Sequence, residues 1–446
     1  MNDTANAVAP VIYTNSLSPV RSVFLAAIMN FLGVLTWGIG VAMGIMHLLP
    51  LDIIVEKSLS FWVVLILSLL FSAIIWNLSV WYLGIPSSSS HALIGSILGV
   101  SIAMQYLDPS VIPSWAKAEE VFKSLLISPL IWFGLAFLCM GLLHKIVTSS
   151  DFFKRPGWLF NREPKNWIRY LLIGVSGFVS YAHGSNDGQK WVGLAMLILI
   201  SLVPASFAIN PSIDMTEIRT NITHVDSVLN AVDETRFETS EKIVFWETRD
   251  HVARLKTLLE QEVLSNTEKV EVRKHILKIQ KDYKVMSEQK YAFIPKVQAD
   301  SFNSAPADLL SLKASIDNIS SATDYAPWWI LAMISIALGA GTMVGWKRIV
   351  TTIWEKIGKE KLNYAQATTG ALITAVTIWT ATKLWLPVST THILSSGIAG
   401  TMTFEHGKWW LQWGTIRHIL MAWVLTLPVT ITLSAGIFLL LWKLFV

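Results

Sequence analysis

The sequence predicts an all-α polytopic membrane protein that consists of two repeats with re-entrant or half-helices and a soluble helical insertion. Composition is the first observation behind this prediction, because 53% of the 446 residues are hydrophobic and only 15% are charged. The second is a series of apolar stretches of about 20 residues, the length at which a helix crosses a bilayer core. The third is a polar motif that occurs once in each half of the chain.

Several stretches are long and apolar enough to be candidate membrane spans. They cover residues 21–46, 60–83, 120–147, 168–183, 187–208, 327–345, 363–385 and 417–445. Two shorter apolar stretches, 91–106 and 389–403, follow Ser- and Thr-rich turns. Their length and position are typical of re-entrant hairpins or half-helices, which proteins tolerate only around a protein-lined cavity.

The charge pattern argues against nucleic acid as a partner. Lys and Arg number 35 against 31 Asp and Glu, and a net charge of +4 is too small to attract a polyanion. Basic residues concentrate at 154–169 and 347–361, and such loops favour the cytoplasmic side of a membrane. The single cysteine, Cys139, lies in an apolar span and permits no internal disulfide.

The two halves of the chain share a motif in register. Residues 85–99, IPSSSSHALIGSILG, match residues 386–400, LPVSTTHILSSGIAG, so that a proline, three hydroxyl residues, a histidine and a glycine coincide. The pair Asn2-Asp3 matches Asn186-Asp187 in the same scheme. Paired repeats with interrupted apolar segments indicate a secondary transporter whose site lies at the repeat interface.

The second half carries roughly 120 more residues than the first between its Asn-Asp pair and its histidine, which suggests an inserted domain. We expect a first, N-terminally short membrane repeat at 1–148, a basic linker loop at 149–166, and a second membrane repeat at 167–209 and 327–446. Residues 210–326 have mixed charge and apolar residues such as Val252, Leu255 and Ile276 at helical spacing. This pattern predicts a soluble helical insertion with a hairpin that breaks near Ser265, and its role is either regulation or that of a solvated spacer.

Hydroxyl residues follow the proline and begin a new apolar helix in both repeats. A helix N-terminus presents unpaired N–H groups and a positive dipole end, to which hydroxyls add uncharged donors. Two such ends that face each other would hold a tetrahedral oxyanion, and ordinary helix capping is the alternative. The candidate anion ligands are Ser88, Ser89, Ser90, Ser389, Thr390 and Thr391.

The Asn-Asp pairs place polar and ionisable groups at membrane depth, where charge is costly and usually functional. Their oxygens suit a hard cation, and a partly desolvated carboxylate suits proton transfer; capping of helix starts is the alternative. The candidates for cation or proton coupling are Asn2, Asp3, Asn6, Asn186, Asp187, Gln189 and Lys190. His91, His183 and His392 are candidates for a proton relay or, equally, for hydrogen-bonded structural histidines.

Lys190 occupies the position at which the first repeat has Asn6. A fixed ammonium group at this position would do the work of a bound metal cation, which predicts coupling to protons. A lysine that reaches toward the membrane surface is the alternative. We expect no cofactor and no metal site. Because no nucleophile motif is visible, we also expect no catalytic residues and therefore no enzyme.

These motifs resemble those of the inorganic phosphate transporter (Pit) family, most closely its bacterial low-affinity, proton-coupled branch. Three segments are similar to signatures of this family, namely NDTANAVAPVIYT at 2–14, HGSNDGQKWVGLAMLILI at 183–200 and PVSTTHILSSGIAGTM at 387–402. The resemblance implies uptake of inorganic phosphate, alone or as a divalent metal-phosphate complex, by symport with protons in preference to sodium. It also implies that the two repeats are inverted relative to each other, and that the protein is a homodimer in the lipid bilayer of the bacterial inner membrane.

Two alternatives to this function stay open at the level of sequence. One is a sulfate permease of the same family, although Asp3 and Asp187 as acceptors favour a protonated phosphate, which can donate hydrogen bonds. The other is a non-transporting membrane sensor or scaffold that acts through the 210–326 insertion. Members of the branch carry a transmembrane helix before the first Asn-Asp pair, and the resemblance predicts that the printed sequence lacks this helix.

Overall fold

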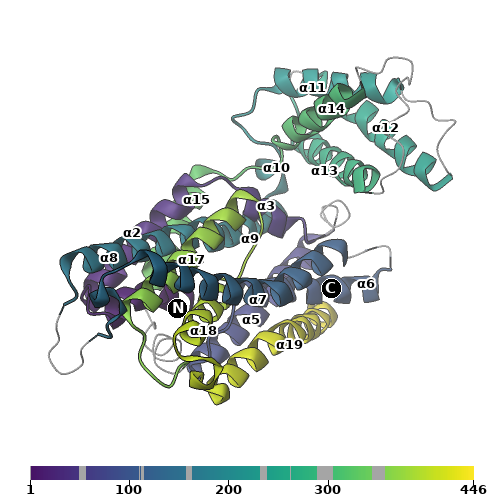
Figure 1. Cartoon of the computed structure of the whole chain (residues 1–446). Helices are drawn as coiled ribbons and strands as arrows, with labels where there is room; N and C mark the ends of the chain where they lie inside the picture. Colours follow the sequence, from purple (N-terminus) through teal and green to yellow (C-terminus); the bar gives the residue numbers. More distant parts are fainter. Residues whose placement is uncertain are drawn as a thin grey trace. The chain divides into compact units, whose positions relative to one another are not determined.

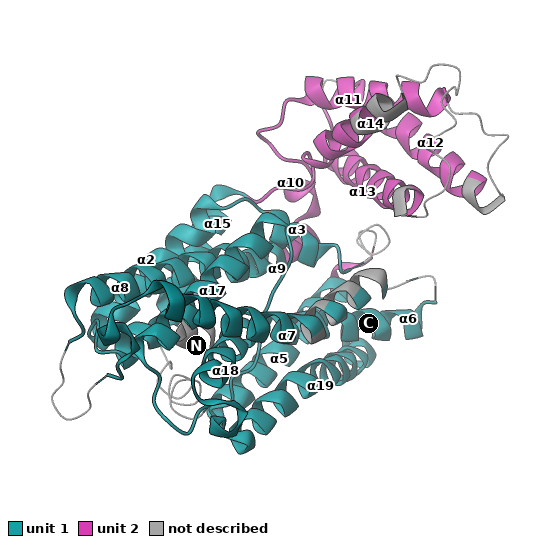
Figure 2. Cartoon of the chain, in the orientation of Figure 1, with its two compact units in different colours: residues 1–50, 60–196, 327–446 teal, residues 51–59, 197–326 magenta. Residues whose placement is uncertain are grey.

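The computed structural model describes residues 2–49, 57–109, 111, 115–156, 163–231, 239–261, 263–288, 305–343 and 357–446. The chain divides into two compact units (Figures 1 and 2). The first unit contains residues 1–50, 60–196 and 327–446, and the second contains residues 51–59 and 197–326. Within the described residues the structure is helical, apart from one isolated bridge between Gly358 and Leu411.

The first unit holds the apolar helices, except for Leu59 and residues 197–202 at the ends of two of them, which belong to the second unit. In chain order they are α1 (Asn2–Tyr13), α2 (Pro19–Thr36), α3 (Gly40–Met46), α5 (Leu59–Tyr82), α6 (Ser89–Leu107), α7 (Trp115–Ile146), η1 (Ser150–Phe153), α8 (Asn166–His183), η2 (Gly184–Gly188), α9 (Gln189–Leu202), α15 (Trp328–Thr342), α17 (Tyr364–Lys383), α18 (Thr390–His406), η4 (Lys408–Trp410) and α19 (Trp413–Phe445). Among the described residues, five helices have a stretch long and apolar enough to cross a membrane, namely α2, α5, α6, α7 from Ile127, and α19. The expectation of an all-α membrane protein is therefore confirmed.

Two elements differ in detail from the sequence-based expectation. The helix α6 has 19 residues and is long and apolar enough to cross a membrane, which exceeds the half-helix expected at 91–106. The segments expected as separate spans at 168–183 and 187–208 are joined through η2 into one continuous helical path. The pair Asn186-Asp187 therefore lies inside a helix and does not cap a helix start.

Helices pack across the two repeats at glycines. The helix α6 lies against α19, and α18 lies against α7. A Cβ atom added at Gly99 would lie 2.2 Å from the carbonyl oxygen of Ile431, and one at Gly400 would lie 2.3 Å from that of Phe133. Since Gly99 and Gly400 are the matched glycines of the repeated motif, both repeats use the same backbone-to-backbone crossing.

The second unit is a small helical assembly with its own core. Its helices are α10 (Pro204–Phe207), α11 (Met215–Asn230), α12 (Thr239–Leu259), α13 (Asn266–Glu288) and α14 (Ala305–Ser320). Ser265 and Glu268 form a capping box at the start of α13, because Ser265 Oγ accepts from Glu268 N at 3.3 Å and Glu268 Oε2 accepts from Ser265 N at 2.8 Å. The helices α11 and α14 pack onto the α12–α13 pair, so the unit contains more than the expected hairpin.

Arg273 fixes the two ends of this unit together. Its side chain is buried, and Nη1 donates to the carbonyl oxygens of Phe207, Ala208 and Thr323 at 3.3, 3.2 and 3.1 Å. Beside it, Asn210 N donates to the carbonyl oxygen of Ala322 at 2.8 Å. The residues that enter and leave the insertion are therefore joined by hydrogen bonds.

We expect Arg273→Met to destabilise the second unit by about 3 kcal/mol, because the substitution leaves buried carbonyl groups without a donor. Hydrogen exchange of α11 and α14 in the full chain measures this change. Arg254→Met is the matched control, since Arg254 forms an exposed ion pair with Asp250. Equal exchange in the two variants would show that Arg273 does not hold the ends together.

Candidate functional site

The second Asn-Asp pair lies in η2, a five-residue π-helical turn between α8 and α9. Turns of this kind occur frequently at functional sites, since they widen the helix and redirect its side chains. The turn is packed closely on α2, because a Cβ atom added at Gly184 would lie 2.3 Å from the carbonyl oxygen of Asn30. This crossing positions Asn186 and Asp187 in the interior of the first unit, where both side chains are buried.

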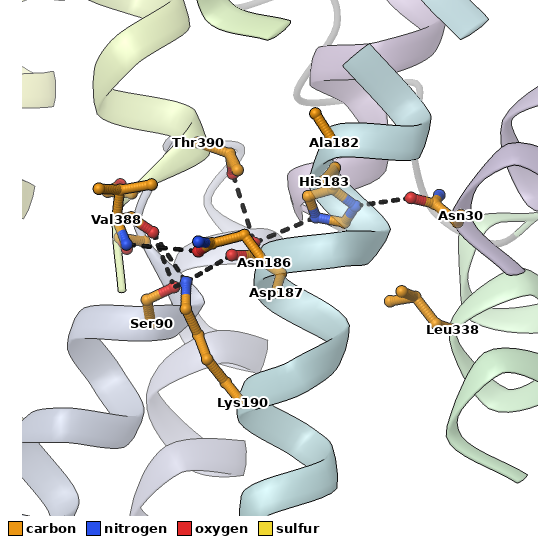
Figure 3. Close-up of polar contacts among 12 residues, drawn as sticks. Asn30, Ser90, Ala182, His183, Asn186, Asp187, Lys190, Leu338, Val388 and Thr390 are labelled. Atoms are coloured by element: carbon orange, nitrogen blue, oxygen red, sulfur yellow. Dashed lines mark hydrogen bonds and ion pairs between the residues drawn. The ribbon is translucent and has the colours of Figure 1, made fainter. Parts of the chain in front are cut away.

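Asp187 is held between two cationic or potentially cationic groups (Figure 3). Its Oδ1 atom lies 2.5 Å from Lys190 Nζ, and its Oδ2 atom lies 3.1 Å from His183 Nε2. The spacing follows from the helix, since residues three and four positions apart share a face. All three side chains are buried, so Asp187 is a desolvated carboxylate with the Lys190 ammonium group on one oxygen and the His183 ring on the other.

His183 has a defined orientation in this cluster. Its Nδ1 atom lies 2.9 Å from Asn30 Oδ1, and Asn30 Nδ2 donates to Thr342 Oγ1 at 3.2 Å. Because the amide oxygen of Asn30 can only accept, Nδ1 of His183 is the donor. The other ring nitrogen, Nε2, therefore faces Asp187 and is positioned to exchange a proton with it.

Lys190 connects both repeats. Its Nζ atom donates to Ser90 Oγ at 2.5 Å and to the carbonyl oxygen of Val388 at 2.7 Å, in addition to Asp187. Ser90 lies in the first turn of α6, and Val388 precedes α18 by two residues. The ammonium group therefore joins the start of α6, the segment before α18 and the η2 turn (Figure 3).

Asn186 fixes the extended segment before α18. Its Nδ2 atom donates to Thr382 Oγ1 and to the carbonyl oxygen of Leu386, each at 3.0 Å, and its Oδ1 atom accepts from Val388 N at 3.3 Å. These contacts use both the nitrogen and the oxygen of the Asn186 amide. They place the α18 N-terminus next to the Asp187 cluster, where Thr390 Oγ1 lies 3.5 Å from Asp187 Oδ2.

The N-termini of α6 and α18 meet through their histidines. Ser88 Oγ accepts from His91 N and Ser389 Oγ accepts from His392 N, both at 3.3 Å, so each serine caps its helix. The ring centroids of His91 and His392 are 4.5 Å apart. Within the part of the chain that is described, buried His91 Nε2 and both ring nitrogens of His392 have no hydrogen-bond partner. Two equivalent helix starts therefore bring polar, uncharged donors and acceptors to one place.

A cleft of about 280 Å³ reaches this cluster. Residues of α5 and α15 form most of its wall, and Ser89, His183, Asp187 and Trp191 also line it. Its surroundings are mainly apolar, with the polar groups at the α6 start and at η2. Such a cleft gives a small polar ligand or a proton a route to Asp187 and His183.

Most of the expected site residues come together in the structure, and some are placed elsewhere or lie outside the description. The residues that come together lie around the α6 start, the α18 start and the η2 turn. They are Ser88, Ser89, Ser90, His91, His183, Asn186, Asp187, Lys190, Ser389, Thr390 and His392. Thr391 is buried in the first turn of α18. Gln189 turns toward α2 and donates to the carbonyl oxygen of Val34 at 3.2 Å. Asn2, Asp3 and Asn6 lie in α1, but their side chains are outside the described residues.

Sequence reasoning missed three contributors to the cluster. Asn30 orients His183, Thr382 accepts from Asn186, and Trp423 stacks on His392 with ring centroids 3.9 Å apart. A polar residue inside an otherwise apolar span was the available signal for Asn30, whereas Thr382 is one of several threonines in α17 and did not stand out. Trp423 gave no such signal, since tryptophan is common in membrane helices.

A buried charged cluster between two helix N-termini, inside a bundle of membrane-length apolar helices, is typical of membrane transporters. The chain belongs to the phosphate transporter family, whose model matches residues 1–434. The relatives are named as transporters, so the expectation that the chain is not an enzyme agrees with them.

The relatives cover nearly the whole chain. It is 36% identical to the low-affinity inorganic phosphate transporters PitB and PitA of Escherichia coli (strain K12), over 98% of this chain and 92% of each relative. A probable low-affinity inorganic phosphate transporter of Bacillus subtilis is 26% identical over 97% of this chain and 90% of the relative. The solved structure of a sodium-dependent phosphate transporter matches all of this chain and 95% of that chain, with a TM-score of 0.53 and 18% identity, and shows that the fold is shared.

Proposed function

We propose that this chain takes up inorganic phosphate across the bacterial inner membrane by symport with protons. The observation that carries the proposal is the meeting of the α6 and α18 starts at His91 and His392, whose rings lie 4.5 Å apart. Helix N-termini and neutral hydroxyls bind a tetrahedral oxyanion without fixed charge, so the anion is released as readily as it is bound. The names of the relatives support phosphate as this anion.

The proposed phosphate ligands are the hydroxyl groups and backbone N–H groups of the first turns of α6 and α18. They comprise Ser88, Ser89, Ser90, Ser389, Thr390 and Thr391. The described residues contain no group of three or more His, Cys, Asp or Glu that could hold a metal ion. We propose that phosphate itself is the transported species, and a divalent metal-phosphate complex is the alternative that the family resemblance leaves open.

The coupling proton is proposed to reside between His183 and Asp187. His183 Nε2 faces the carboxylate at 3.1 Å, and both groups line the cleft, so a proton can enter there. His91 and His392 are proposed to relay the proton toward the phosphate. A homodimer is a further proposal that rests on the family resemblance alone.

Phosphate uptake into proteoliposomes that contain the purified full chain tests the proposal. We expect an inwardly directed proton gradient to drive uptake of radiolabelled phosphate, arsenate to compete and sulfate to compete weakly, because a protonated phosphate or arsenate donates hydrogen bonds that sulfate lacks. EDTA is expected to leave the rate unchanged. Strong competition by sulfate would indicate the sulfate permease instead, and a requirement for added magnesium would indicate a metal-phosphate complex.

Deletion of most of the second unit distinguishes the transporter from the sensor alternative. A chain in which residues 211–321 are replaced by a short Gly-Ser linker is expected to retain uptake, because the proposed ligands all lie in the first unit. Empty liposomes and liposomes with the full chain are the controls. No uptake by the full chain under any gradient would leave the sensor as the better reading.

A further inference from the structure

We propose that Lys190 is a tethered cation that permanently fills the place of a coupling metal ion in the second repeat, so that transport by this chain needs no sodium. The inference rests on the proposed phosphate transport. It adds a residue that decides which cation the transporter uses.

The ligands of the Lys190 ammonium group are those of a hard cation. Nζ contacts a carboxylate oxygen of Asp187 and the hydroxyl oxygen of Ser90, each at 2.5 Å, and the carbonyl oxygen of Val388 at 2.7 Å. One carboxylate, one hydroxyl and one backbone carbonyl from three segments of the chain form the mixed oxygen set that proteins offer to hard metal ions. The side chain is 2% exposed, so water contributes little to the neutralisation of its charge.

The position of the ammonium group is unfavourable for an ordinary structural lysine. It lies at the start of α6 and just before α18, where the dipole ends of both helices are positive. A cation at this point is retained only because Asp187 and the Val388 carbonyl group face it. The contacts show that the lysine does not reach toward the membrane surface, which was the alternative from the sequence.

The two repeats differ at this position in a way that a built-in cation explains. Asn2, Asp3 and Asn6 of the first repeat correspond to Asn186, Asp187 and Lys190 of the second. Asparagine offers a neutral oxygen that can bind a cation, whereas lysine supplies the positive charge itself. Only the second repeat therefore has a fixed charge where the first has a neutral side chain.

Phosphate uptake in proteoliposomes with either sodium or choline as the external cation tests the inference. The wild-type chain is expected to transport equally in both salts. The uptake rate of Lys190→Asn is expected to be at least ten-fold below that of the wild type in choline and to recover most of this loss in sodium. The uptake rate of Lys190→Met, which offers no oxygen, is expected to stay low in both salts. Lys383→Asn is the matched control, since Lys383 lies over the Trp379 ring at the end of α17 and is expected to behave as wild type.

Thermal unfolding of the purified proteins gives a readout that does not require transport. Sodium is expected to raise the melting temperature of Lys190→Asn relative to choline and to leave that of the wild type unchanged. If sodium raises the melting temperature of Lys190→Asn no more than that of the wild type, or if Lys190→Asn and Lys190→Met transport normally in choline, Lys190 is not a tethered cation. If the wild type takes up no phosphate at all, the proposed function fails, and the melting temperatures still decide the role of Lys190.

Discussion

We expect Asp187→Asn to abolish phosphate uptake and to lower the free energy of unfolding of the first unit by about 3–5 kcal/mol. The substitution keeps the shape of the side chain and removes its charge. Lys190 then carries a buried positive charge without its 2.5 Å carboxylate partner, and His183 loses the group with which it is proposed to share a proton. Uptake assays and thermal unfolding of the purified chain measure the two effects separately.

A double variant separates the transport role of Asp187 from its role in stability. Asp187→Asn combined with Lys190→Met removes both charges, and the cost is smaller than for Asp187→Asn alone because no buried charge is left unpaired. We expect the double variant to regain most of the lost stability and none of the uptake. If Asp187→Asn alone retained a third or more of the wild-type rate, the carboxylate would not be part of the transport site.

Asp151→Asn is the matched control for the carboxylate. Asp151 lies in η1 and also pairs with two lysines, Lys154 and Lys165, at the protein surface. Hydrogen bonds from these lysines lower the pKa of Asp151 to about 2, so the group is ionised under assay conditions. Because water screens this exposed cluster, we expect its loss to leave uptake unchanged.

Alanine at Gly99 or Gly400 is expected to destabilise the first unit by about 1–3 kcal/mol and to reduce uptake. The added methyl group would lie 2.2 Å or 2.3 Å from a backbone carbonyl oxygen, and a backbone cannot rotate away as a side chain can. The helices α6 and α18 must then shift away from α19 and α7. Since their first turns carry the proposed phosphate ligands, the shift also disturbs the site.

Two glycines on the partner helices α7 and α19 provide controls. Gly134 in α7 and Gly436 in α19 have nothing within 4 Å of an added Cβ atom. We expect alanine at either position to leave stability unchanged or to raise it by about 0.5–1 kcal/mol, because glycine is the weaker helix former. Equal melting temperatures for Gly400→Ala and Gly134→Ala would contradict the close crossing.

Periodicity and composition predicted the helices because burial in a bilayer and helical packing both follow from local sequence. The apolar positions Val252, Leu255 and Ile276 were expected on core faces of the second unit and are buried there. The helix caps Ser88 and Ser389 were also readable, since a hydroxyl residue after a proline is a local signal.

The contacts within the site could not be predicted from sequence. Lys190 meets a serine 100 residues away, and His183 meets an asparagine 153 residues away. The crossing of α2 and α8 at Gly184 sets the second of these contacts, and no sequence pattern encodes such a register. The π-helical turn was missed for the same reason, because packing around Asn186 and Asp187 and not helix propensity stabilises it.

The joined ends of the second unit have a consequence for how such a chain can change over generations. Asn210 and Ala322 are linked by a 2.8 Å hydrogen bond, so roughly 110 intervening residues begin and end at one point. The entropic free-energy cost of bringing the two ends of a segment together grows slowly with the length of the segment, by about 0.6 kcal/mol for each doubling. Gene rearrangement could therefore lengthen, shorten or exchange this segment with little penalty at its junction, which makes the junction a natural acceptor for fused reporter or sensing domains.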